Sequence, residues 1–457
     1  MNIIGHPVQI FKQKLAHSLG LPFQEVLPET IIQEAIRAEG VTYRKRLFWP
    51  VVTVWMFLSQ ALDKDKSCEN AVSRMIAWLS SQKAPIPSSD PSAYCQARQR
   101  LPEELFKRLF VGEAHRLQSG VSPEGLWKGR RVFLVDGSTL SMPDTPANQA
   151  TYPQQKSQAP GCGFPLARIV SLFSLATGAV WDLLVGDWKT SELKMARQLY
   201  EQLAPQDILV GDRLFGSYAD FWMLQTRDVD GLFRMHQRRK ADFRRGKRLG
   251  KNDHLVIWTK PKQRPQGLPQ EIYDPLPETL TIRELKHALQ RKGFRTEQVT
   301  LTTTLLDAKA YPRDDLAELF GTRWSVELNL RHLKTTMGMD VLSTQTPQMV
   351  RKEIFCHLLA YNLIRSLMWE AAVQHNVSAL HLSIQATIRH VLNFAPQLAQ
   401  AGHQKRRTLY HILLGLIAQE QVPKRPGRSE PRVRKRRPKA YPLMSKPRQV
   451  LRRKLAS

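Results

Sequence analysis

The sequence is poor in cysteine, and its acidic residues are few for its size. Its 457 residues include four cysteines and 40 aspartates and glutamates, against 68 lysines and arginines. The cysteines form no CxxC pair, and no group of histidines and cysteines has the spacing of a zinc site, which excludes the common structural zinc motifs. So little cysteine also argues against a disulfide-stabilised secreted protein, and we expect a reducing, cytoplasmic location.

Several other signals are missing. No GxxxxGK[ST] phosphate loop is present, so ATP hydrolysis is not indicated. The first residues have no signal-peptide profile. Residues 169–185 are almost continuously apolar, but Asp182 and the Thr177-Gly178 turn predict two buried strands rather than a membrane span. We therefore expect neither a membrane nor ATP among the partners.

Positive charge is what the sequence has in excess. The net charge is +28, and residues 422–457 alone hold fourteen lysines and arginines against one acid. A second basic run covers residues 237–251. Such an excess is self-repelling unless a polyanion binds, and nucleic acid is the usual partner. An anionic membrane surface is the rival, but no basic amphipathic anchor is evident.

The pattern of apolar residues changes along the chain. Residues 1–125 have the periodicity of helices, whereas the next hundred alternate strands and helices in the order β-β-β-α-β-α-β. This order predicts an α/β fold with a mixed sheet. The expected strands are 130–140, 166–175, 179–185, 207–212 and 231–236, and the expected helices are 190–203, capped at Thr190 or Ser191, and 216–226.

The remaining chain predicts three further regions. A β-rich insertion with basic loops covers about residues 237–303 and interrupts a core that spans residues 126–372. C-terminal helices are expected within residues 373–421. Residues 422–457, rich in proline and arginine, are expected to form a basic flexible tail because they cannot bury enough apolar surface to fold alone.

Three carboxylates have the sequence context of a catalytic site. Asp136 and Asp212 each end a predicted strand, in VFLVDG and DILVGD. Glu327 lies in FGTRWSVELNLRHLK, which predicts an amphipathic helix with Arg323, Arg331 and Lys334 on or near the same face. The simpler interpretation of this helix is an i,i+4 ion pair between Glu327 and Arg331 on a solvated face. Other acids could replace a ligand, namely Asp144, Asp182, Asp187 and Asp340.

A cation-lined group of three carboxylates suits phosphodiester chemistry. Two Mg²⁺ ions need hard oxygen ligands at an open edge of a rigid scaffold, and they take their other ligands from water and substrate phosphate. We therefore predict that Asp136, Asp212 and Glu327 hold two Mg²⁺ ions, for which Mn²⁺ could substitute. The neighbouring cations would bind phosphates, and His332 is predicted to face a phosphate or to pack.

These blocks resemble the DDE transposases of the bacterial insertion-sequence-4 family. Phe320, Arg323, Glu327 and Lys334 keep the family's Tyr-Arg-Glu-Lys spacing, with phenylalanine in place of tyrosine. VDGSTLSMPDTPANQ and GDRLFGSY are similar to the blocks around the two aspartates, and the resemblance extends to SAYCQARQRL and to the basic tail. It implies an RNase H-like catalytic core preceded by a helical DNA-binding domain.

The resemblance implies cut-and-paste transposition of an insertion sequence. Two protomers would pair the terminal inverted repeats and cut each end, the cut DNA would pass through a hairpin, and the ends would then be joined to target DNA. The expected location is the cytoplasm, in association with the nucleoid. The residues expected to contact DNA are Arg323, Lys334, Arg331, Arg213, Trp324, Trp258, Arg238 and Arg239. Trp258 could equally be a core residue. Two other functions stay open: a catalytically silent transposase-derived DNA-binding protein, and an RNase H-like nuclease or resolvase without strand transfer.

Overall fold

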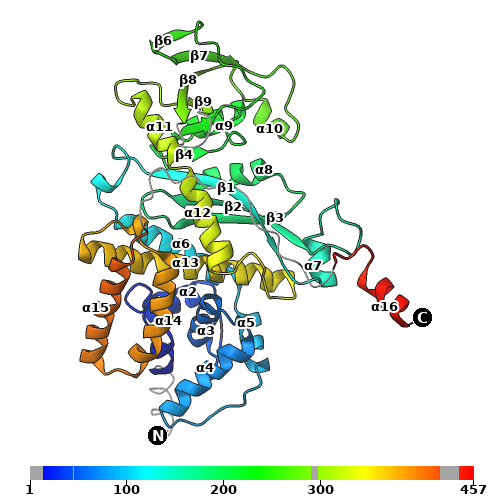
Figure 1. The fold of residues 1–457 in the computed structure, drawn as a ribbon, viewed down its shortest axis with the longest axis vertical. Helices are drawn as coiled ribbons and strands as arrows, with labels where there is room; N and C mark the ends of the chain where they lie inside the picture. Colours follow the sequence, from blue (N-terminus) through cyan, green and yellow to red (C-terminus); the bar gives the residue numbers. More distant parts are fainter. Residues whose placement is uncertain (1–13, 45, 290–296, 423–441, 457) are drawn as a thin grey trace. The chain divides into compact units, whose positions relative to one another are not determined.

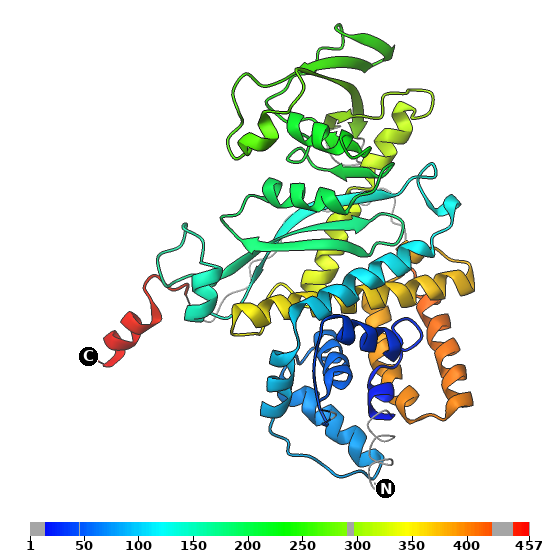
Figure 2. The ribbon, with the colours of Figure 1, turned by 180° about the vertical axis from the view of Figure 1, so that it is seen from behind.

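The chain has a mixed α/β fold in which helices precede and follow a large sheet in sequence, as Figures 1 and 2 show. This computed structural model describes residues 14–44, 46–289, 297–422 and 442–456. The chain divides into two compact units. The helical unit takes in the chain up to Val121, Thr177–Trp181 and Asn329–Val422, and the sheet unit takes in Ser122–Ala176, Asp182–Leu328 and the C-terminal segment.

The sheet contains nine described strands in the order β3-β2-β1-β4-β5-β9-β8-β7-β6. β1 is antiparallel to β2 but parallel to β4, and β4 is parallel to β5. This confirms the predicted mixed sheet, and the order 3-2-1-4-5 of its first five strands is that of an RNase H-like core. The strands are β1 (Val132–Ser141), β2 (Leu166–Ser174), β3 (Val180–Asp187), β4 (Ile208–Gly211), β5 (Asp230–Arg234), β6 (Lys247–Gly250), β7 (Asp253–Thr259), β8 (Thr279–Leu289) and β9 (Glu297–Thr303).

The β-rich insertion extends this sheet. β9 pairs antiparallel with β5, β8 with β9, and β7 with β8, so the insertion continues the same hydrogen-bonded ladder. β6 ends the sheet as an edge strand, and its Lys247 and Arg248 are exposed. Charged side chains on an edge strand oppose pairing with another chain.

Short helices of the sheet unit pack on the strands. α8 buries Met195, Ala196 and Leu199 and lies against β2. Ser217 caps α9, because its hydroxyl accepts a hydrogen bond from the backbone N–H of Asp220 at 3.3 Å. The helices of this unit are α7 (Pro146–Thr151), α8 (Glu192–Leu199), α9 (Tyr218–Gln225), α10 (Gln270–Tyr273) and α11 (Arg313–Gly321), followed by α12 (Trp324–Arg331), which runs on into the helical unit.

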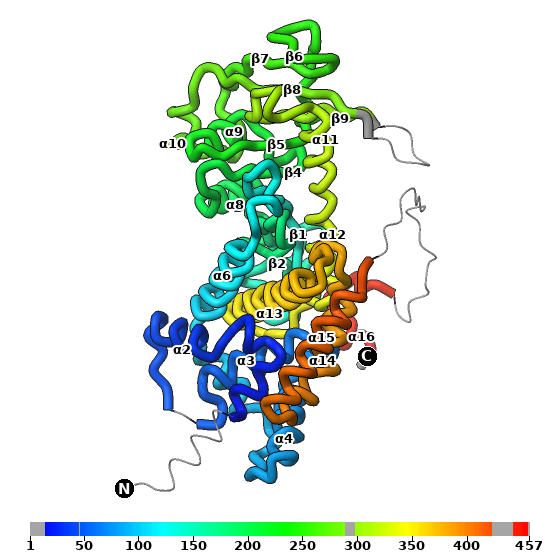
Figure 3. Tube along the Cα trace, turned by 90° about the vertical axis from the view of Figure 1, so that its left-hand side faces the viewer, coloured from blue at the N-terminus to red at the C-terminus, as the bar shows by residue number. Residues whose placement is uncertain are grey.

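The helical unit is organised around α13 (Pro347–His375). Residues on all sides of this helix are buried along most of its length, so it has neighbours all around it. α6, α15, α3 and α14 supply them, and Figure 3 shows the arrangement. These neighbours and the remaining helices are α2 (Glu29–Ala38), α3 (Pro50–Leu62), α4 (Cys68–Ser81), α5 (Ser92–Arg100), α6 (Glu103–Ser119), α14 (Ile384–Gln400) and α15 (His403–Gln419).

The predicted basic tail contains a helix that its composition does not predict. Arg448–Ala456 form α16. Residues 423–441 of the predicted tail lie outside the described residues. None of the described helices is both long and apolar enough to cross a bilayer.

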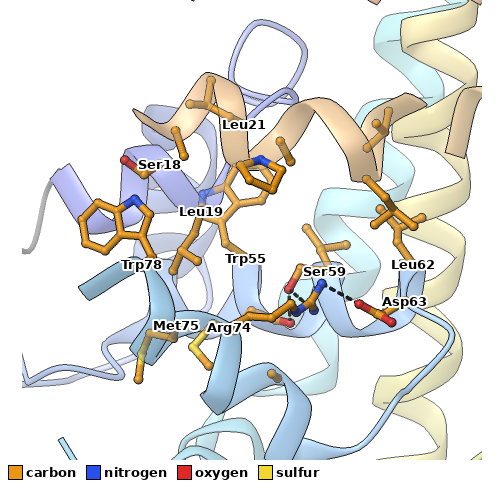
Figure 4. A pocket seen from close by; sticks show the side chains of 18 of the residues that line it. Ser18, Leu19, Leu21, Trp55, Ser59, Leu62, Asp63, Arg74, Met75 and Trp78 are labelled. Atoms are coloured by element: carbon orange, nitrogen blue, oxygen red, sulfur yellow. Dashed lines mark hydrogen bonds and ion pairs between the residues drawn. The ribbon is translucent and has the colours of Figure 1, made fainter. Parts of the chain in front are cut away.

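The helical unit contains a half-open, mainly apolar pocket of about 430 Å³ (Figure 4). Trp55, Met75 and Trp78 line it, together with residues of α14. An ion pair of 2.7 Å between Arg74 and Asp63 is its main polar feature. The pocket therefore has the character of a gap between packed helices, without the several convergent polar groups of a ligand site.

Candidate active site

Asp136 lies in the middle of β1, which continues to Ser141, so the prediction that this aspartate ends its strand is wrong, whereas Asp212 directly follows the neighbouring parallel strand β4, as predicted. The parallel register pairs Leu134 of β1 with Val210 of β4. Asp136 and Asp212 each come two residues after this pair, so both aspartates follow the end of the ladder between the two strands. β1 lies between β2, which is antiparallel to it, and β4, which is parallel to it (Figure 1).

The pKa of Asp136 is shifted by its burial and by neighbouring charges. Burial raises the pKa of its carboxyl to about 6, and the negative charges of Asp212 and Glu192 add to the rise. The backbone N–H of Gly137, which donates to Oδ1 at 2.8 Å, and the guanidinium of Arg323 act in the opposite direction. A carboxyl with a raised pKa beside further carboxylates is typical of a functional site that accepts a cation.

Glu192 is a member of this group that the sequence interpretation misses. The sequence predicts it only as a first-turn acid of a helix, and Ser191 is the N-cap of that helix, α8. A Cβ at Gly137 would lie 2.1 Å from Oε1 of Glu192, so the absence of a side chain there lets this carboxylate approach the backbone beside Asp136. Nothing in the local sequence distinguishes it from an ordinary helix-dipole residue.

The predicted single helix around Glu327 is three segments, which corrects that prediction. α11 ends at Gly321, α12 runs over Trp324–Arg331, and residues His332–Thr336 form a π-helical turn. The break occurs where Thr322 directs its hydroxyl to the carbonyl of Leu319 at 2.6 Å. Because a π turn has more residues per turn than an α-helix, Lys334 does not follow the 3.6-residue face that the spacing implies.

Glu327 is held by a cation on its N-terminal side. Nη2 of Arg323 donates to Oε1 of Glu327 at 3.0 Å across the i,i+4 spacing. This ion pair replaces the one with Arg331 that the simpler interpretation predicts, and Arg331 is exposed. Arg323 also lowers the pKa of Asp136, so its guanidinium acts on two of the three predicted ligands.

Two side chains that follow α12, Lys334 and His332, have shifted pKa values. Burial lowers the pKa of Lys334, with Asp340 opposing the change. Burial and the charges of Arg365 and Arg331 lower the pKa of His332 to about 4. Nδ1 of His332 is buried and has no hydrogen-bond partner among the described residues. His332 is therefore a neutral, packed imidazole, which fits the packing alternative.

Some of the other residues predicted to contact DNA are buried and some are exposed. Trp258 is 5% exposed, its Nε1 donates to Glu284 at 2.8 Å, and the guanidinium of Arg239 covers its ring at 3.7 Å. These contacts fit the core interpretation of Trp258, and both residues are engaged with each other. Arg238 is exposed, and Arg213 is half-buried, with Nη1 donating to Gln237 at 3.1 Å. Trp324 is 39% exposed.

The alternative acids have local roles. Asp187 accepts hydrogen bonds from the backbone N–H of Thr190 at 2.8 Å and from its hydroxyl at 2.5 Å. Asp144 accepts from the side chain of Gln149 at 2.7 Å, and Asp182 is buried within β3. Asp340 is exposed in the helical unit. Neither Asp144, Asp182 nor Asp187 is among the groups that perturb Asp136.

The carboxylates of Asp136 and Asp212 are oxygen donors of the kind that a divalent ion binds. In the part of the chain that the structure describes, no three histidine, cysteine or acidic side chains are grouped closely enough to hold a metal. The charge of Asp212 acts on Asp136, whereas Glu327 is paired with Arg323. The hard oxygen donors suit Mg²⁺ or Mn²⁺, and the like charges beside Asp136 would be relieved by either ion.

Two sequence families cover most of the chain. The Transposase DDE domain family matches residues 127–363, and the Insertion element 4 transposase N-terminal family matches residues 17–111. Both ranges agree with the predicted resemblance. They place the three carboxylates in one domain family and the helices before Val121 in the other.

Individual proteins similar to this chain are also transposases of insertion sequences. The chain is 30% identical over 429 residues to the transposase InsG for insertion sequence element IS4 of Escherichia coli K12, covering 92% of each chain. It is 24% identical over 271 residues to the transposase for insertion sequence element IS421 of Escherichia coli, covering 53% of this chain and 67% of the relative.

One solved structure has a weak structural similarity to this chain. The piggyBac transposase synaptic complex with hairpin DNA shares 10% identity and a TM-score of 0.45, covering 86% of this chain and 84% of that one. At that score the two folds share only a general resemblance. The family matches and the full-length relative carry the assignment: this chain belongs to the DDE transposases of the insertion element 4 family.

Proposed function

We propose that this transposase moves its insertion sequence by cut and paste, with Asp136, Asp212 and Glu327 as the catalytic carboxylates. The observation that supports this most directly is the parallel register that sets Asp136 beside Asp212, with Arg323 acting on both Asp136 and Glu327. Those residues occur in the order Asp-Asp-Glu within the matched DDE domain. Cleavage and joining are both in-line displacements at phosphorus, so one site can serve each step.

Asp136, Asp212 and Glu327 would hold Mg²⁺, for which Mn²⁺ could substitute. Two bound ions would activate the attacking water or 3′-hydroxyl and stabilise the leaving oxygen. Arg323 would exchange Glu327 for a substrate phosphate, because a guanidinium binds two phosphate oxygens as readily as a carboxylate. This exchange would release Glu327 only when DNA is present.

The proposed substrates are the terminal inverted repeats of the element and its target DNA. Exposed bases of the insertion, from Arg238 to Lys251, form a run on and beside the edge strand β6 that suits a phosphate backbone. Pairing of two ends requires two active sites, so we propose a dimer in the synaptic complex. A hairpin at the cut ends would need a base to leave the stack, and the half-exposed Trp324 is better placed to stack on it than Trp258.

The test uses the full chain, Mg²⁺ and an end-labelled duplex carrying the element's terminus, with products resolved on a denaturing gel. Wild type is expected to nick at the terminus and to give hairpin or joined products. Glu327→Gln should bind the duplex but leave it uncut. Glu318→Gln, the same change at an exposed residue of the neighbouring α11, should cut like wild type.

The outcomes separate the alternatives. Binding without cutting in either Mg²⁺ or Mn²⁺ would favour a silent DNA-binding protein. Cutting without any joined product would favour a nuclease or resolvase. Cutting that survives in Glu327→Gln would show that this residue is not the third catalytic carboxylate.

A further inference from the structure

A groove belongs to the helical unit, whereas the proposed catalytic carboxylates belong to the sheet unit. The groove has a volume of about 490 Å³ and is formed by the segment between α2 and α3, the first turn of α3, and the end of α5. Its lining includes three arginines and three aromatic side chains, namely Arg44, Arg46, Arg100, Tyr43, Phe48 and Trp49. No aspartate or glutamate of the described residues lines it.

The three arginines are free to bind an anion. Arg44, Arg46 and Arg100 are all exposed. None of them makes an ion pair with a carboxylate in the described parts of the chain, and Arg100 instead donates to the neutral side chain of Gln96 at 3.1 Å. Three unneutralised guanidinium groups around one hollow repel each other, and this repulsion is relieved when an anion binds.

Arg98 and Arg100 lie on the same helix but differ in exposure. Both arginines belong to α5, two residues apart, but Arg98 is 7% exposed. Arg98 donates to Gln60 at 3.1 Å and to the sulfur of Cys68 at 2.9 Å, and its guanidinium lies over the rings of Phe57 and Tyr94. Arg98 therefore stabilises the helix packing, whereas Arg100 presents its charge to the groove.

Aromatic packing and hydrogen bonds form the floor of the groove. Trp49 is 1% exposed, and its ring stacks against Tyr43 with centroids 6.0 Å apart. The hydroxyl of Thr53 donates to the backbone carbonyls of Phe48 at 3.2 Å and of Trp49 at 3.1 Å, so the residues just before α3 are bonded to its first turn.

The start of α3 adds to the positive potential. Trp49 is the N-cap residue and provides no side-chain hydrogen bond, and the first turn contains no acid. The N-terminus of this 13-residue helix therefore keeps its partial positive charge where Trp49, Pro50 and Thr53 line the groove. This feature reinforces the arginines, which carry the argument.

We propose that this groove binds the phosphate backbone of DNA through Arg44, Arg46 and Arg100. The inference rests on the proposed function, because it assigns to the element's terminal DNA a contact outside the catalytic unit. Guanidinium groups bind phosphate oxygens bidentately, and contacts to the backbone set the register of the duplex without reading its sequence. The groove would thus hold the DNA, and base-edge contacts elsewhere would select it.

The experiment measures fluorescence anisotropy of the full-length chain with two labelled duplexes of equal length, over a range of KCl concentrations. One duplex carries the element's terminus and the other a scrambled sequence. The variant Arg44→Gln/Arg46→Gln/Arg100→Gln is compared with Arg37→Gln/Lys107→Gln/Arg407→Gln. The control removes the same charge at three exposed residues of the helical unit that do not line the groove.

The groove variant is expected to bind both duplexes about tenfold more weakly or worse at moderate salt, with their affinity ratio unchanged. Its plot of log affinity against log salt should be shallower by about 0.9 for each phosphate that the protein no longer neutralises. The matching triple substitution to lysine should restore the slope, because lysine also neutralises phosphate. The control variant should keep the wild-type slope.

An unchanged salt slope in the groove variant would overturn the proposal, and so would an equally weakened affinity in the control variant. A weaker affinity for the terminal duplex alone would also overturn it, because it would indicate base recognition. These outcomes are independent of cleavage. Wild type that binds DNA through the groove but never cuts would contradict the proposed function and leave the groove assignment standing.

Discussion

Arg323 and Glu327 form an i,i+4 ion pair of 3.0 Å, and the same guanidinium lowers the pKa of Asp136. One cation therefore neutralises one predicted metal ligand and acts on a second. A divalent ion at this site and Arg323 would compete for the same carboxylate. The consequence is a site whose affinity for metal depends on where the Arg323 side chain is bound.

Replacing Arg323 should strengthen metal binding in the absence of DNA and weaken catalysis in its presence. The two side chains are 22% and 39% exposed. An ion pair at that exposure is worth about 1 kcal/mol or less, so Arg323→Gln should raise the affinity for Mn²⁺ by up to about fivefold. Paramagnetic resonance of free Mn²⁺ at pH 8 measures this directly. Arg313→Gln, which removes an arginine paired with Asp314 on α11, should leave the Mn²⁺ affinity unchanged; equal affinities in all three proteins would contradict the competition.

Metal binding should weaken as the pH falls below about 6. Asp136 has its pKa raised to about 6, and the carboxyl must lose its proton before it can bind a cation. Glu192→Gln removes a like charge, so the pKa of Asp136 should fall and the midpoint of the Mn²⁺ affinity profile should shift to lower pH. Titration of Mn²⁺ at successive pH values tests this. Glu201→Gln, at an exposed residue of the same region, should keep the wild-type midpoint; a shared midpoint for all three proteins would refute the role of Glu192.

Acid should destabilise the helical unit through His332. Its folded-state pKa is about 4, below the ordinary value of 6.5, so the folded state favours the neutral ring. The stabilisation is complete above pH 6.5 and is lost as the pH falls toward 4, by up to about 3 kcal/mol. Calorimetric melting temperatures between pH 7.5 and pH 4 should therefore fall less steeply in His332→Gln than in wild type. His403→Gln, at an exposed position, should follow wild type; parallel curves for His332→Gln and wild type would show that the ring titrates normally.

Trp258 and Trp324 should respond in opposite ways to truncation. Trp258 is 5% exposed and Trp324 is 39% exposed. Trp258→Ala removes a buried ring and its hydrogen bond to Glu284, and should reduce the free energy of unfolding by about 3 to 5 kcal/mol. Trp324→Ala should cost less stability but weaken binding or hairpin formation at the element's terminus. Urea denaturation and duplex binding distinguish the two; a stable Trp258→Ala protein with impaired DNA binding would restore the DNA-contact interpretation of that residue.

The mixed sheet and the place of Asp212 after a strand could be predicted because they depend on local patterns. Short runs of β-branched and aromatic residues mark β1 and β4, and β4 stops directly before Asp212, whereas β1 continues past Asp136 to Ser141. The order of strands and helices then restricts the topology, since short connections and right-handed crossovers leave few arrangements. The basic insertion followed from composition, and most bases of its 237–251 run are exposed because ionised side chains remain in water unless they are paired, as the buried Arg283 is with Asp253.

Other features depended on contacts between residues far apart in the sequence. Local periodicity implies one helix from Phe320 to Lys334, but the chain breaks at Thr322 and forms a π turn after Arg331. The approach of Glu192 to Asp136 depends on α8 packing against β2, which no spacing within either element encodes.

The sequence by itself determined the excess of positive charge, the order of the secondary elements of the sheet and the place of Asp212 directly after a strand, because composition and period are local properties. Only the tertiary structure decided which charges are neutralised. It paired Arg323 with Glu327, buried Arg98 among aromatic rings and left Arg100 exposed in a groove. The physical reason is that the environment of a side chain is set by neighbours brought from elsewhere in the chain, and those neighbours determine its burial, its pKa and its partner.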